Sequence, residues 1–310
     1  MKKIFHGNSV KTFLLKLLIF AVTVAGADII VGRILERSYF SQRHGYDYLS
    51  THTIQNTTAP VLFFGSSRAV NIFNPAVAEK EFNLPCFNAG REGQSVFYHY
   101  AVLKSVLKRY KPKIVVLSFD AGDFANGRDD YDRISTLLPY YEKNPEIAAV
   151  INLKGPFEKI KTISNIYPYN SLVLPILSTT LRKDDKYKDI AGHIPLKRKF
   201  NGPLHTMDFT KMSVLDTNKI NVYRNFISDC KDANIELHIV CPPYLVNSIG
   251  TDASTSVAKK IASAYQVNFF DHSADSFYTS QPALFADFRH LNEKGAELFT
   301  EAVAEKISQQ

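Results

Sequence analysis

Val61-Leu62-Phe63-Phe64-Gly65-Ser66-Ser67-Arg68 is the stretch from which the fold of this chain can be inferred. Its four consecutive apolar residues predict a strand buried on both faces, and the Gly-Ser-Ser that follows predicts a tight turn. A helix is expected soon afterwards, because Asn74 is a good N-cap and Pro75 suits the first helical position. The order strand, turn, helix is the repeating unit of parallel α/β sheets.

The same order recurs on both sides of a long irregular segment. Further apolar strands are expected at residues 84–88, 114–119, 235–240 and 267–270, and helices at residues 95–110, 216–233, 251–265 and 291–307. Asn292 is the expected N-cap of the last helix. Apolar strands that alternate with helices predict an α/β fold, in which a parallel sheet is covered by helices on both faces.

Residues 124–212 interrupt this order. The segment is rich in Tyr, Lys and Asn, has only scattered helical patterns, and is too long for a single loop. We therefore expect an insertion that covers or shapes a pocket. Its basic run Lys197-Arg198-Lys199 is typical of a solvated surface, and contact with an anionic polymer is the alternative.

The N-terminal region predicts a single membrane anchor. Residues 13–31 are mostly apolar apart from Lys16 and Asp28, and their length suits one membrane span. The span is preceded by the cations Lys2, Lys3 and Lys11. These cations would hold the N-terminus in the cytoplasm and place the rest of the chain outside. Two alternatives stay open. Ala25-Gly26-Ala27 resembles the cleavage site of a signal peptide, and an amphipathic helix of a soluble protein would accommodate the two charges more easily.

The anchor is favoured over a signal peptide because the apolar pattern continues through Ile34 and Leu35. The expected organisation follows from these patterns. It comprises a cytoplasmic tip and transmembrane anchor at residues 1–35, a polar juxtamembrane linker at residues 36–59, and an α/β domain at residues 60–310 with its insertion at residues 124–212.

Composition narrows the classes of function. The net charge of +7 fits anionic lipids, envelope polymers or nucleic acid, but no zinc-finger spacing, RNA-binding motif or long basic run supports nucleic acid. Scattered histidines without i, i+4 pairs give no support for a metal site, and no Walker lysine or dinucleotide fingerprint predicts a cofactor. The three cysteines are expected to be buried free thiols, and a Cys230–Cys241 bridge is the alternative.

Four predicted loops leave the carboxyl ends of strands, where sites form in open α/β sheets. These loops carry Gly65-Ser66-Ser67, residues 89–93, residues 120–123, and the pair Asp287 and His290. Asp287 could fix the tautomer of His290 and leave the other ring nitrogen free to act as a base. A serine of the first loop could then lose its proton to His290. Its own N–H and that of Gly93 could receive a developing oxyanion.

Three of these stretches together resemble the GDSL/SGNH hydrolase superfamily: Gly65-Ser66-Ser67 after an apolar strand, Asn88-Ala89-Gly90-Arg91-Glu92-Gly93, and Asp287-x-x-His290. The likeness is greatest to the membrane-anchored bacterial envelope members, which have a Gly-Ser-Ser block and a large central insertion. It covers roughly residues 60–123 and 215–307. The resemblance implies a flavodoxin-like three-layer α/β/α fold and a Ser–His–Asp mechanism of ester hydrolysis or acyl transfer.

The resemblance also implies a role for each matching residue. Ser67 falls at the nucleophile position, where its N–H also contributes to the oxyanion hole, and Ser66 beside it is the alternative nucleophile. His290 and Asp287 fall at the terminal base and its partner, and Gly93 falls at the oxyanion glycine.

The third block departs from the family pattern. Ser118-Phe119-Asp120 stands where the family usually has an Asn that donates to the oxyanion, and an ionised Asp120 can only accept. Three explanations stay open: Asp120 is protonated, it has another role, or the oxyanion hole has only two donors. Arg68 is expected to pair with a nearby carboxylate, and binding of an anionic substrate is its alternative role.

Two functions of different classes follow. The first is a serine esterase or O-acyltransferase, with O-acetyl as the expected group, acting on an envelope polysaccharide or cell-wall glycan. It would be a single-pass protein of a bacterial inner membrane with its catalytic domain on the periplasmic side. Hydrolase and transferase share one acyl-enzyme, so the sequence does not separate them. The second is a catalytically silent scaffold or binding subunit of an envelope polymer-assembly complex, which the Asp120 departure favours. A nucleotide- or flavin-binding protein is a third, for which no phosphate loop is present.

Overall fold

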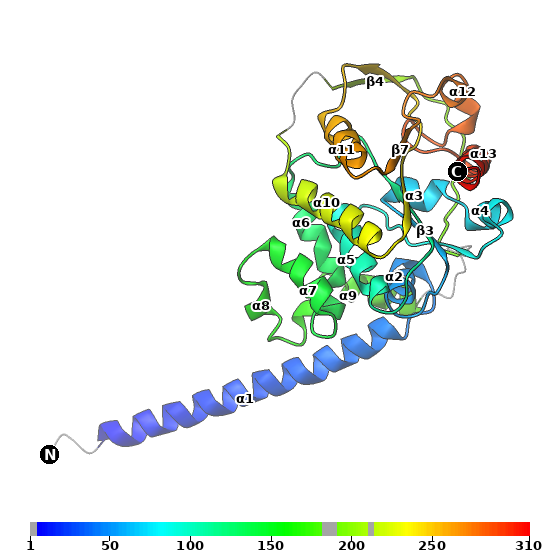
Figure 1. The fold of residues 1–310 in the computed structure, drawn as a ribbon. Coiled ribbons are helices and arrows are strands. Elements are labelled where there is room, and N and C mark those ends of the chain that lie inside the picture. The colour runs from blue at the N-terminus through cyan, green and yellow to red at the C-terminus, as the bar shows by residue number, and fades with distance from the viewer. Residues whose placement is uncertain (1–4, 182–190, 210–213) are drawn as a thin grey trace.

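The computed structural model of the chain describes residues 5–181, 191–209 and 214–310. Its centre is a five-stranded, all-parallel sheet with the order β2-β1-β3-β5-β7 (Figure 1). The strands of this sheet are β1 (Val61–Phe64), β2 (Cys86–Asn88), β3 (Ile114–Ser118), β5 (Glu236–Cys241) and β7 (Asn268–Asp271). Numbered along the chain within this sheet, the order is 2-1-3-4-5, as in flavodoxin-like folds. The predicted parallel α/β fold is confirmed.

Helices cover both faces of the sheet because successive side chains of each strand point to opposite faces. In β1, Leu62 and Phe64 belong to one apolar cluster, and Val61 and Phe63 belong to the other. The first face is covered by α2 (Gly45–Gln55), α5 (Val96–Leu107), α7 (Pro145–Ile151), α10 (Thr217–Asp232) and α11 (Ala253–Ala264). The second face is covered by α3 (Ser67–Ile72), α4 (Pro75–Phe82), α12 (Ser276–Thr279), η4 (Pro282–Leu284) and α13 (Glu293–Ser308).

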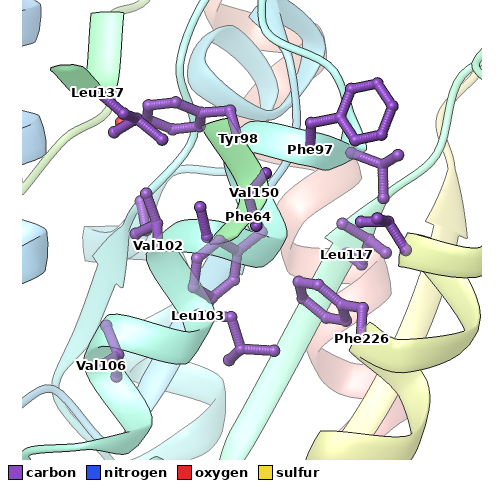
Figure 2. Packing of buried hydrophobic residues seen from close by; sticks show 14 of the residues in the cluster. Phe64, Phe97, Tyr98, Val102, Leu103, Val106, Leu117, Leu137, Val150 and Phe226 are labelled. Carbon is purple, nitrogen blue, oxygen red and sulfur yellow. The ribbon is translucent and has the colours of Figure 1, made fainter. Parts of the chain in front are cut away.

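The core of the first face forms around Phe64, the last residue of β1. Its ring meets that of Phe226 on α10 edge to face, with centroids 5.7 Å apart, and Leu103 of α5 belongs to the same buried cluster (Figure 2). Burial of one such side chain contributes about 1.5–3 kcal/mol. This packing therefore holds two helices against β1 and fixes the strand that leads into the Gly65 turn.

Both predicted helix N-caps are confirmed. Asn74 accepts the N–H of Ala76 at the start of α4, where Pro75 is the first helical residue. Asn292 accepts the N–H of Gly295 at 3.1 Å, at the start of α13. The second cap matters most for function, because it fixes the beginning of the helix that follows Asp287 and His290.

The segment predicted as a linker at residues 36–59 is part of the folded domain instead. α1 (Phe5–Phe40) continues into it, and Tyr39 is fully buried near the C-terminal end of that helix. α2 packs on α5, and Asp47 of α2 forms an ion pair at 2.6 Å with Arg91 of the loop between β2 and α5. Arg109 donates three hydrogen bonds to backbone carbonyls at residues 53, 54 and 57. The segment is polar, and its composition is therefore like that of a linker. Several of its polar groups are instead buried, where they bind arginines of the folded domain.

The insertion consists of short helices and half of a small ribbon. Its elements besides α7 are α6 (Arg128–Arg133), η1 (Ile134–Tyr140), η2 (Asn152–Lys154), α8 (Glu158–Lys161), η3 (Tyr167–Tyr169), α9 (Val173–Leu181) and β4 (His205–Asp208). β4 pairs in parallel with β6 (Val246–Ile249), and the sequence did not predict this ribbon because both strands are short and mostly exposed. Residues 182–190 and 210–212 of the predicted insertion lie outside the described residues.

One described helix is long and apolar enough to cross a membrane. Residues Ser9–Phe40 of α1 have a window of mean hydropathy 2.3, no part of which is buried. A signal sequence can have the same length and composition. Lys2 and Lys3, predicted to hold the N-terminus in the cytoplasm, lie outside the described residues.

The three cysteines are buried free thiols, so the alternative of a Cys230–Cys241 bridge is wrong for this structure. Burial raises the pKa of the Cys86 thiol to about 12. Burial likewise raises the pKa values of Cys230 and Cys241. None of the three is a reactive thiolate at neutral pH.

Candidate active site

Ser67 is the first residue of α3 and follows directly the turn that leaves β1. Gly65 in this turn has a φ of +141°, and a Cβ atom there would lie 2.6 Å from the Cβ of Ser118 and 2.9 Å from that of Ala69. Only glycine lets the chain turn this sharply beside β3. As the first helical residue, Ser67 has a backbone N–H with no carbonyl one turn earlier to accept it. The turn therefore presents both a hydroxyl and an amide donor.

Ser67, His290 and Asp287 form one hydrogen-bonded chain. Ser67 Oγ lies 2.8 Å from His290 Nε2, and His290 Nδ1 lies 2.8 Å from Asp287 Oδ1. A carboxylate accepts the proton of Nδ1, which leaves Nε2 to accept the hydrogen bond from the serine hydroxyl. The structure thus brings together three residues that the sequence predicted, although 223 positions separate the serine from the histidine.

The Asp287 carboxylate is held by both oxygens. Oδ1 also accepts the backbone N–H groups of Arg289 and His290, and Oδ2 accepts a hydrogen bond from Arg198 at 2.5 Å. Burial alone would raise the pKa of Asp287, but the hydrogen bonds from His290, Arg289 and Arg198 lower it well below its usual range. This interaction stabilises the fold above the unfolded pKa of about 3.9, and the stabilisation is lost as the pH falls through the lower folded value.

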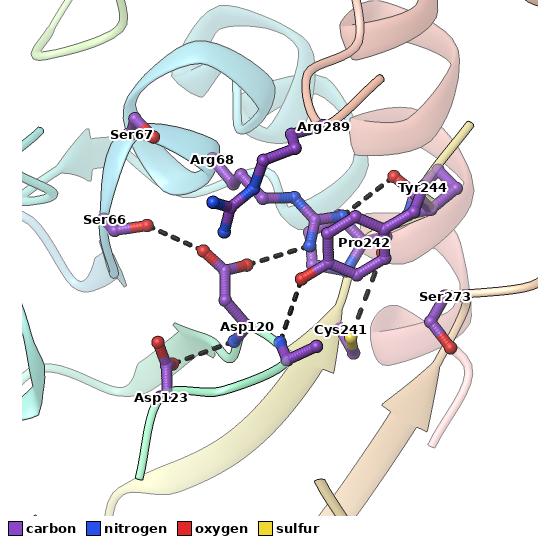
Figure 3. Close-up of polar contacts among 12 residues, drawn as sticks. Ser66, Ser67, Arg68, Asp120, Asp123, Cys241, Pro242, Tyr244, Ser273 and Arg289 are labelled. Atoms are coloured by element: carbon purple, nitrogen blue, oxygen red, sulfur yellow. Dashed lines mark hydrogen bonds and ion pairs between the residues drawn. The ribbon is translucent and has the colours of Figure 1, made fainter. Parts of the chain in front are cut away.

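A buried ion pair occupies the place where the resemblance to the GDSL/SGNH superfamily implied an amide donor. Asp120 Oδ1 accepts from Arg68 Nη1 at 2.9 Å, and Asp120 Oδ2 accepts from Ser66 Oγ at 2.8 Å (Figure 3). The Asp120 N–H donates to Asp123 Oδ2 at 2.8 Å. Asp120 is therefore an acceptor with both oxygens engaged, and the expectation that it donates to the oxyanion is wrong. Of the three explanations, another role for Asp120 fits the geometry.

Arg68 and Ser66 are likewise structural partners of Asp120. Arg68 is fully buried, so its alternative role as a substrate-binding residue is wrong and its expected pairing with a carboxylate is confirmed. Its guanidinium lies 3.7 Å from the centre of the Tyr244 ring. Burial alone would lower the pKa of Arg68, but Tyr244 and Asp120 raise it above its usual value. Ser66 is not placed as the alternative nucleophile, because its hydroxyl donates to Asp120 whereas His290 bonds to Ser67.

The glycine-bearing loop after β2 is tied to the same turn. Asn88 Nδ2 donates to the carbonyl of Ala69 in α3, and Asn88 Oδ1 accepts the N–H of Gly90. The N–H of Arg91 donates to the carbonyl of Gly65 at 3.0 Å. These bonds hold the loop that carries Gly93 against the turn that carries Ser67.

Gly93 has the backbone conformation of a residue that must be glycine. Its φ is +69°, and a Cβ atom would lie 2.5 Å from Arg133 Nη1, which donates to the Gly93 carbonyl at 2.9 Å. Within the described ranges, the N–H of Gly93 makes no hydrogen bond. Arg133 comes from the insertion, and no local pattern in the sequence pointed to its contact with this loop.

Arg289 is a second residue of interest that the sequence did not single out. Its only sequence signal was its place between Asp287 and His290. Figure 3 shows its guanidinium pointing toward the space beside Asp120 and Ser66. Its Nε is buried and has no hydrogen-bond partner among the described residues. The arrangement therefore holds an unused buried donor close to the Asp287–His290 loop.

No protein-family model matches this sequence, and no curated protein matches it. Within the described residues, no group of three or more His, Cys, Asp or Glu side chains could hold a metal ion.

Solved structures show a distant likeness. A family two carbohydrate esterase from Clostridium thermocellum in complex with cellohexaose has a TM-score of 0.41 and 11% identity, over 80% of this chain and 63% of that one. LAE5, an α/β hydrolase from the metagenome of Lake Arreo in Spain, has a TM-score of 0.42 and 10% identity, over 83% of this chain and 98% of that one. The acetyl xylan esterase Est2A from the rumen bacterium Butyrivibrio proteoclasticus has a TM-score of 0.36 and 9% identity, over 80% of this chain and 63% of that one. The chain thus spans less than two thirds of the length of two of these structures.

Proposed function

We propose that this chain is a serine esterase or O-acyltransferase that acts on acylated carbohydrate of the cell envelope, with acetyl as the expected acyl group. The observation that carries the proposal is the chain of hydrogen bonds from Ser67 through His290 to Asp287, with both steps at 2.8 Å. A serine hydroxyl is a weak nucleophile at neutral pH, and an oriented imidazole is the group that activates it.

The chemistry follows from this geometry. Ser67 Oγ attacks the acyl carbonyl carbon while its proton passes to His290 Nε2, and Asp287 stabilises the imidazolium that forms. The tetrahedral intermediate collapses when the C–O bond to the sugar breaks and His290 returns the proton to the leaving sugar oxygen. The acyl group is then an ester on Ser67. Attack by water completes a hydrolysis, and attack by another sugar hydroxyl completes a transfer, with His290 again acting as the base.

The proposed oxyanion hole uses the N–H groups of Ser67 and Gly93, with Arg289 as a third donor. Asp120 is excluded because its oxygens already accept hydrogen bonds from Arg68 and Ser66. The buried and unpartnered Nε of Arg289 supports the assignment of Arg289, since a charged donor in a shielded site interacts strongly with a developing negative charge. A guanidinium would thus replace the amide donor that the family usually has.

We expect Arg289→Gln to lower kcat about 10²-fold with little change in KM, because loss of one oxyanion donor typically costs 10²–10³ in kcat. Arg289→Lys should retain an intermediate rate, since it keeps the charge but not the fork of donors. Steady-state kinetics with p-nitrophenyl acetate measure both constants. A rise in KM at unchanged kcat would show that Arg289 binds substrate rather than the oxyanion.

Arg198→Gln should have a smaller effect than loss of Asp287. The Arg198 side chain is 65% exposed, and exposed ion pairs contribute at most about 1 kcal/mol, which corresponds to less than about tenfold in kcat/KM. The pKa of Asp287 should rise toward its usual value, because one of the groups that lower it is removed. The pH–rate profile of the variant, beside that of Lys199→Gln as a neighbouring cation, checks this. A loss equal to that of Asp287→Ala would contradict it.

The proposal further places the chain in a bacterial inner membrane through α1, with the α/β domain on the periplasmic side. The apolar, exposed surface of α1 supports this location. Membrane fractionation before and after alkali treatment tests it, since a protein anchored by α1 remains in the pellet.

A fluorophosphonate probe applied to the full chain in detergent tests the enzyme class. Such probes phosphonylate activated serines, so the wild type should be labelled and should hydrolyse p-nitrophenyl acetate. A wild type that neither reacts with the probe nor cleaves the ester would contradict the enzyme proposal. That result would instead favour a catalytically silent binding subunit.

A further inference from the structure

The insertion carries an unusual concentration of exposed apolar side chains. Beyond α1, ten large apolar side chains of the described residues are exposed, and six of them fall within residues 153–177. These six, here called the α8–α9 patch, are Leu153, Phe157, Ile160, Ile163, Leu174 and Leu177. Ile163 and Leu174 are each 78% exposed. Exposed apolar side chains concentrated in one segment make that segment a candidate interaction surface.

The patch belongs to the part of the insertion that is attached to α1. Asp28 of α1 accepts hydrogen bonds from Ser164 Oγ, from the backbone and side-chain N–H groups of Asn165, and from the backbone N–H of Ile166. Gly32, one turn later in α1, lies so close to Asn165 that a Cβ atom there would be 2.4 Å from the Cβ of Asn165. α9 also contacts α1 directly. The charge of Asp28, anomalous in an apolar helix, is therefore explained by its partners in the insertion.

This attachment fixes the level of the patch along α1. Fourteen large apolar side chains of α1 between Val10 and Ile34 are exposed, and a stretch of about 20 residues crosses a hydrocarbon core of about 30 Å. Asp28 lies near the C-terminal end of that apolar stretch. Ile163 directly precedes Ser164, so it lies at the level of Asp28. Figure 1 shows α8 on the side of the domain that faces α1, and the insertion contacts α1 through η3 and α9.

The charges around the patch fit a lipid surface. Residues 153–177 contain three lysines and a single acid, Glu158. Glu158 is turned inward, where it is buried and bonded to Lys161 and Tyr167. An open cavity of about 650 Å³ lies just past the apolar stretch and is lined by Arg33, Arg37 and Lys143, together with Glu36, which pairs with Lys143. Cations and tyrosines are typical of the headgroup level of a bilayer.

We propose that the α8–α9 patch is a second membrane contact, inserted in the interfacial layer of the bilayer that α1 spans. The occupant of the patch is lipid, because the patch continues the lipid-facing surface of α1 and its own segment, residues 153–177, has three lysines against one buried acid. The inference rests on the proposed membrane span and is independent of the proposed chemistry at Ser67. Its consequence is that the domain is held against the bilayer at two places and cannot swing freely about α1.

Single-cysteine labelling of the full chain tests the proposal. Ile163→Cys and Leu174→Cys are prepared, reconstituted in nanodiscs of phosphatidylethanolamine and phosphatidylglycerol, and labelled with the environment-sensitive thiol reagent NBD. The three native cysteines are buried and should stay unlabelled. Val22→Cys in α1 is the control inside lipid. Phe277→Cys is the matched control for an exposed apolar residue, since Phe277 is 54% exposed on α12, which Figure 1 shows on the side of the domain away from α1.

We expect blue-shifted emission and strong quenching by spin-labelled lipids at positions 163, 174 and 22, and water-like emission at position 277. Water-like emission at 163 and 174 with quenching at 22 would overturn the proposal while leaving the membrane span intact. Water-like emission at all positions would overturn the span and the proposal together. Shielding at 163 and 174 that occurs in native membranes but not in nanodiscs would assign the patch to a protein partner and would also overturn it. Thermal unfolding within a few degrees of wild type shows that each variant is folded.

Discussion

Ser67→Ala is expected to abolish fluorophosphonate labelling and to lower kcat for p-nitrophenyl acetate by at least about 10³-fold. The hydroxyl that bonds to His290 Nε2 is the atom that becomes acylated in the proposed mechanism, and loss of a triad nucleophile is among the largest single effects on an enzyme. Labelling followed on a gel and ester hydrolysis followed by absorbance measure the two effects. His290→Ala should have a loss of similar size, since nucleophile and base act as one unit.

Ser66→Ala is the matched control for this prediction. It removes an adjacent hydroxyl of the same turn, one that donates to Asp120 rather than to His290. It should keep the labelled serine and a measurable rate, with some loss of stability because one oxygen of a buried carboxylate loses a donor. Labelling that survives Ser67→Ala and disappears in Ser66→Ala would show that the wrong serine was assigned.

Asp120→Asn should destabilise the protein by about 3–5 kcal/mol, the usual cost of removing one partner of a buried ion pair. The change inserts the residue that the resemblance to the GDSL/SGNH superfamily implies at this position. Here it would leave the Arg68 guanidinium, whose side chain is 1% exposed, without its counter-charge. Thermal unfolding of the full chain in detergent measures the loss. Asp132→Asn is the control, because that carboxylate is 56% exposed and its ion pairs contribute little.

The double variant Asp120→Asn with Arg68→Met tests the cause of this loss. If the unpaired buried charge is responsible, removing both charges should be less destabilising than the sum of the single changes. An Asp120→Asn protein as stable as wild type and more active would contradict this account. It would show that an amide at residue 120 reaches the oxyanion and that the ion pair is dispensable.

The sequence predicted the sheet and most of its helices to within a few residues. Apolar runs such as residues 61–64 and 114–118 predict buried parallel strands. N-cap residues such as Asn74 and Asn292 predict the start of the helix that directly follows them. These signals are local, so they survive in the sequence. α2 and the β4–β6 ribbon were missed because their residues are mostly polar and are stabilised by distant partners.

It was also predictable that Ser67, His290 and Asp287 lie close together. Ser67 follows a predicted strand, His290 and Asp287 precede a predicted helix, and loops at the carboxyl ends of parallel strands meet at one edge of the sheet. The surroundings of these residues were not. Arg198 reaches Asp287 across 89 positions from a basic run that looked like a solvated surface. Arg133 reaches Gly93 across 40 positions from within the insertion.

The sequence by itself thus determined the parallel α/β order and the residues of the candidate catalytic chain, since periodicity, caps and the carboxyl ends of strands are properties of short segments. Only the tertiary structure decided how the isolated charges are used. Asp120 pairs with Arg68, which lies 52 positions away in the sequence. Asp28 binds residues of the insertion that lie 136 to 138 positions away. A charge in an apolar setting must find a partner because its desolvation is costly, but nothing in the local sequence states which partner that is.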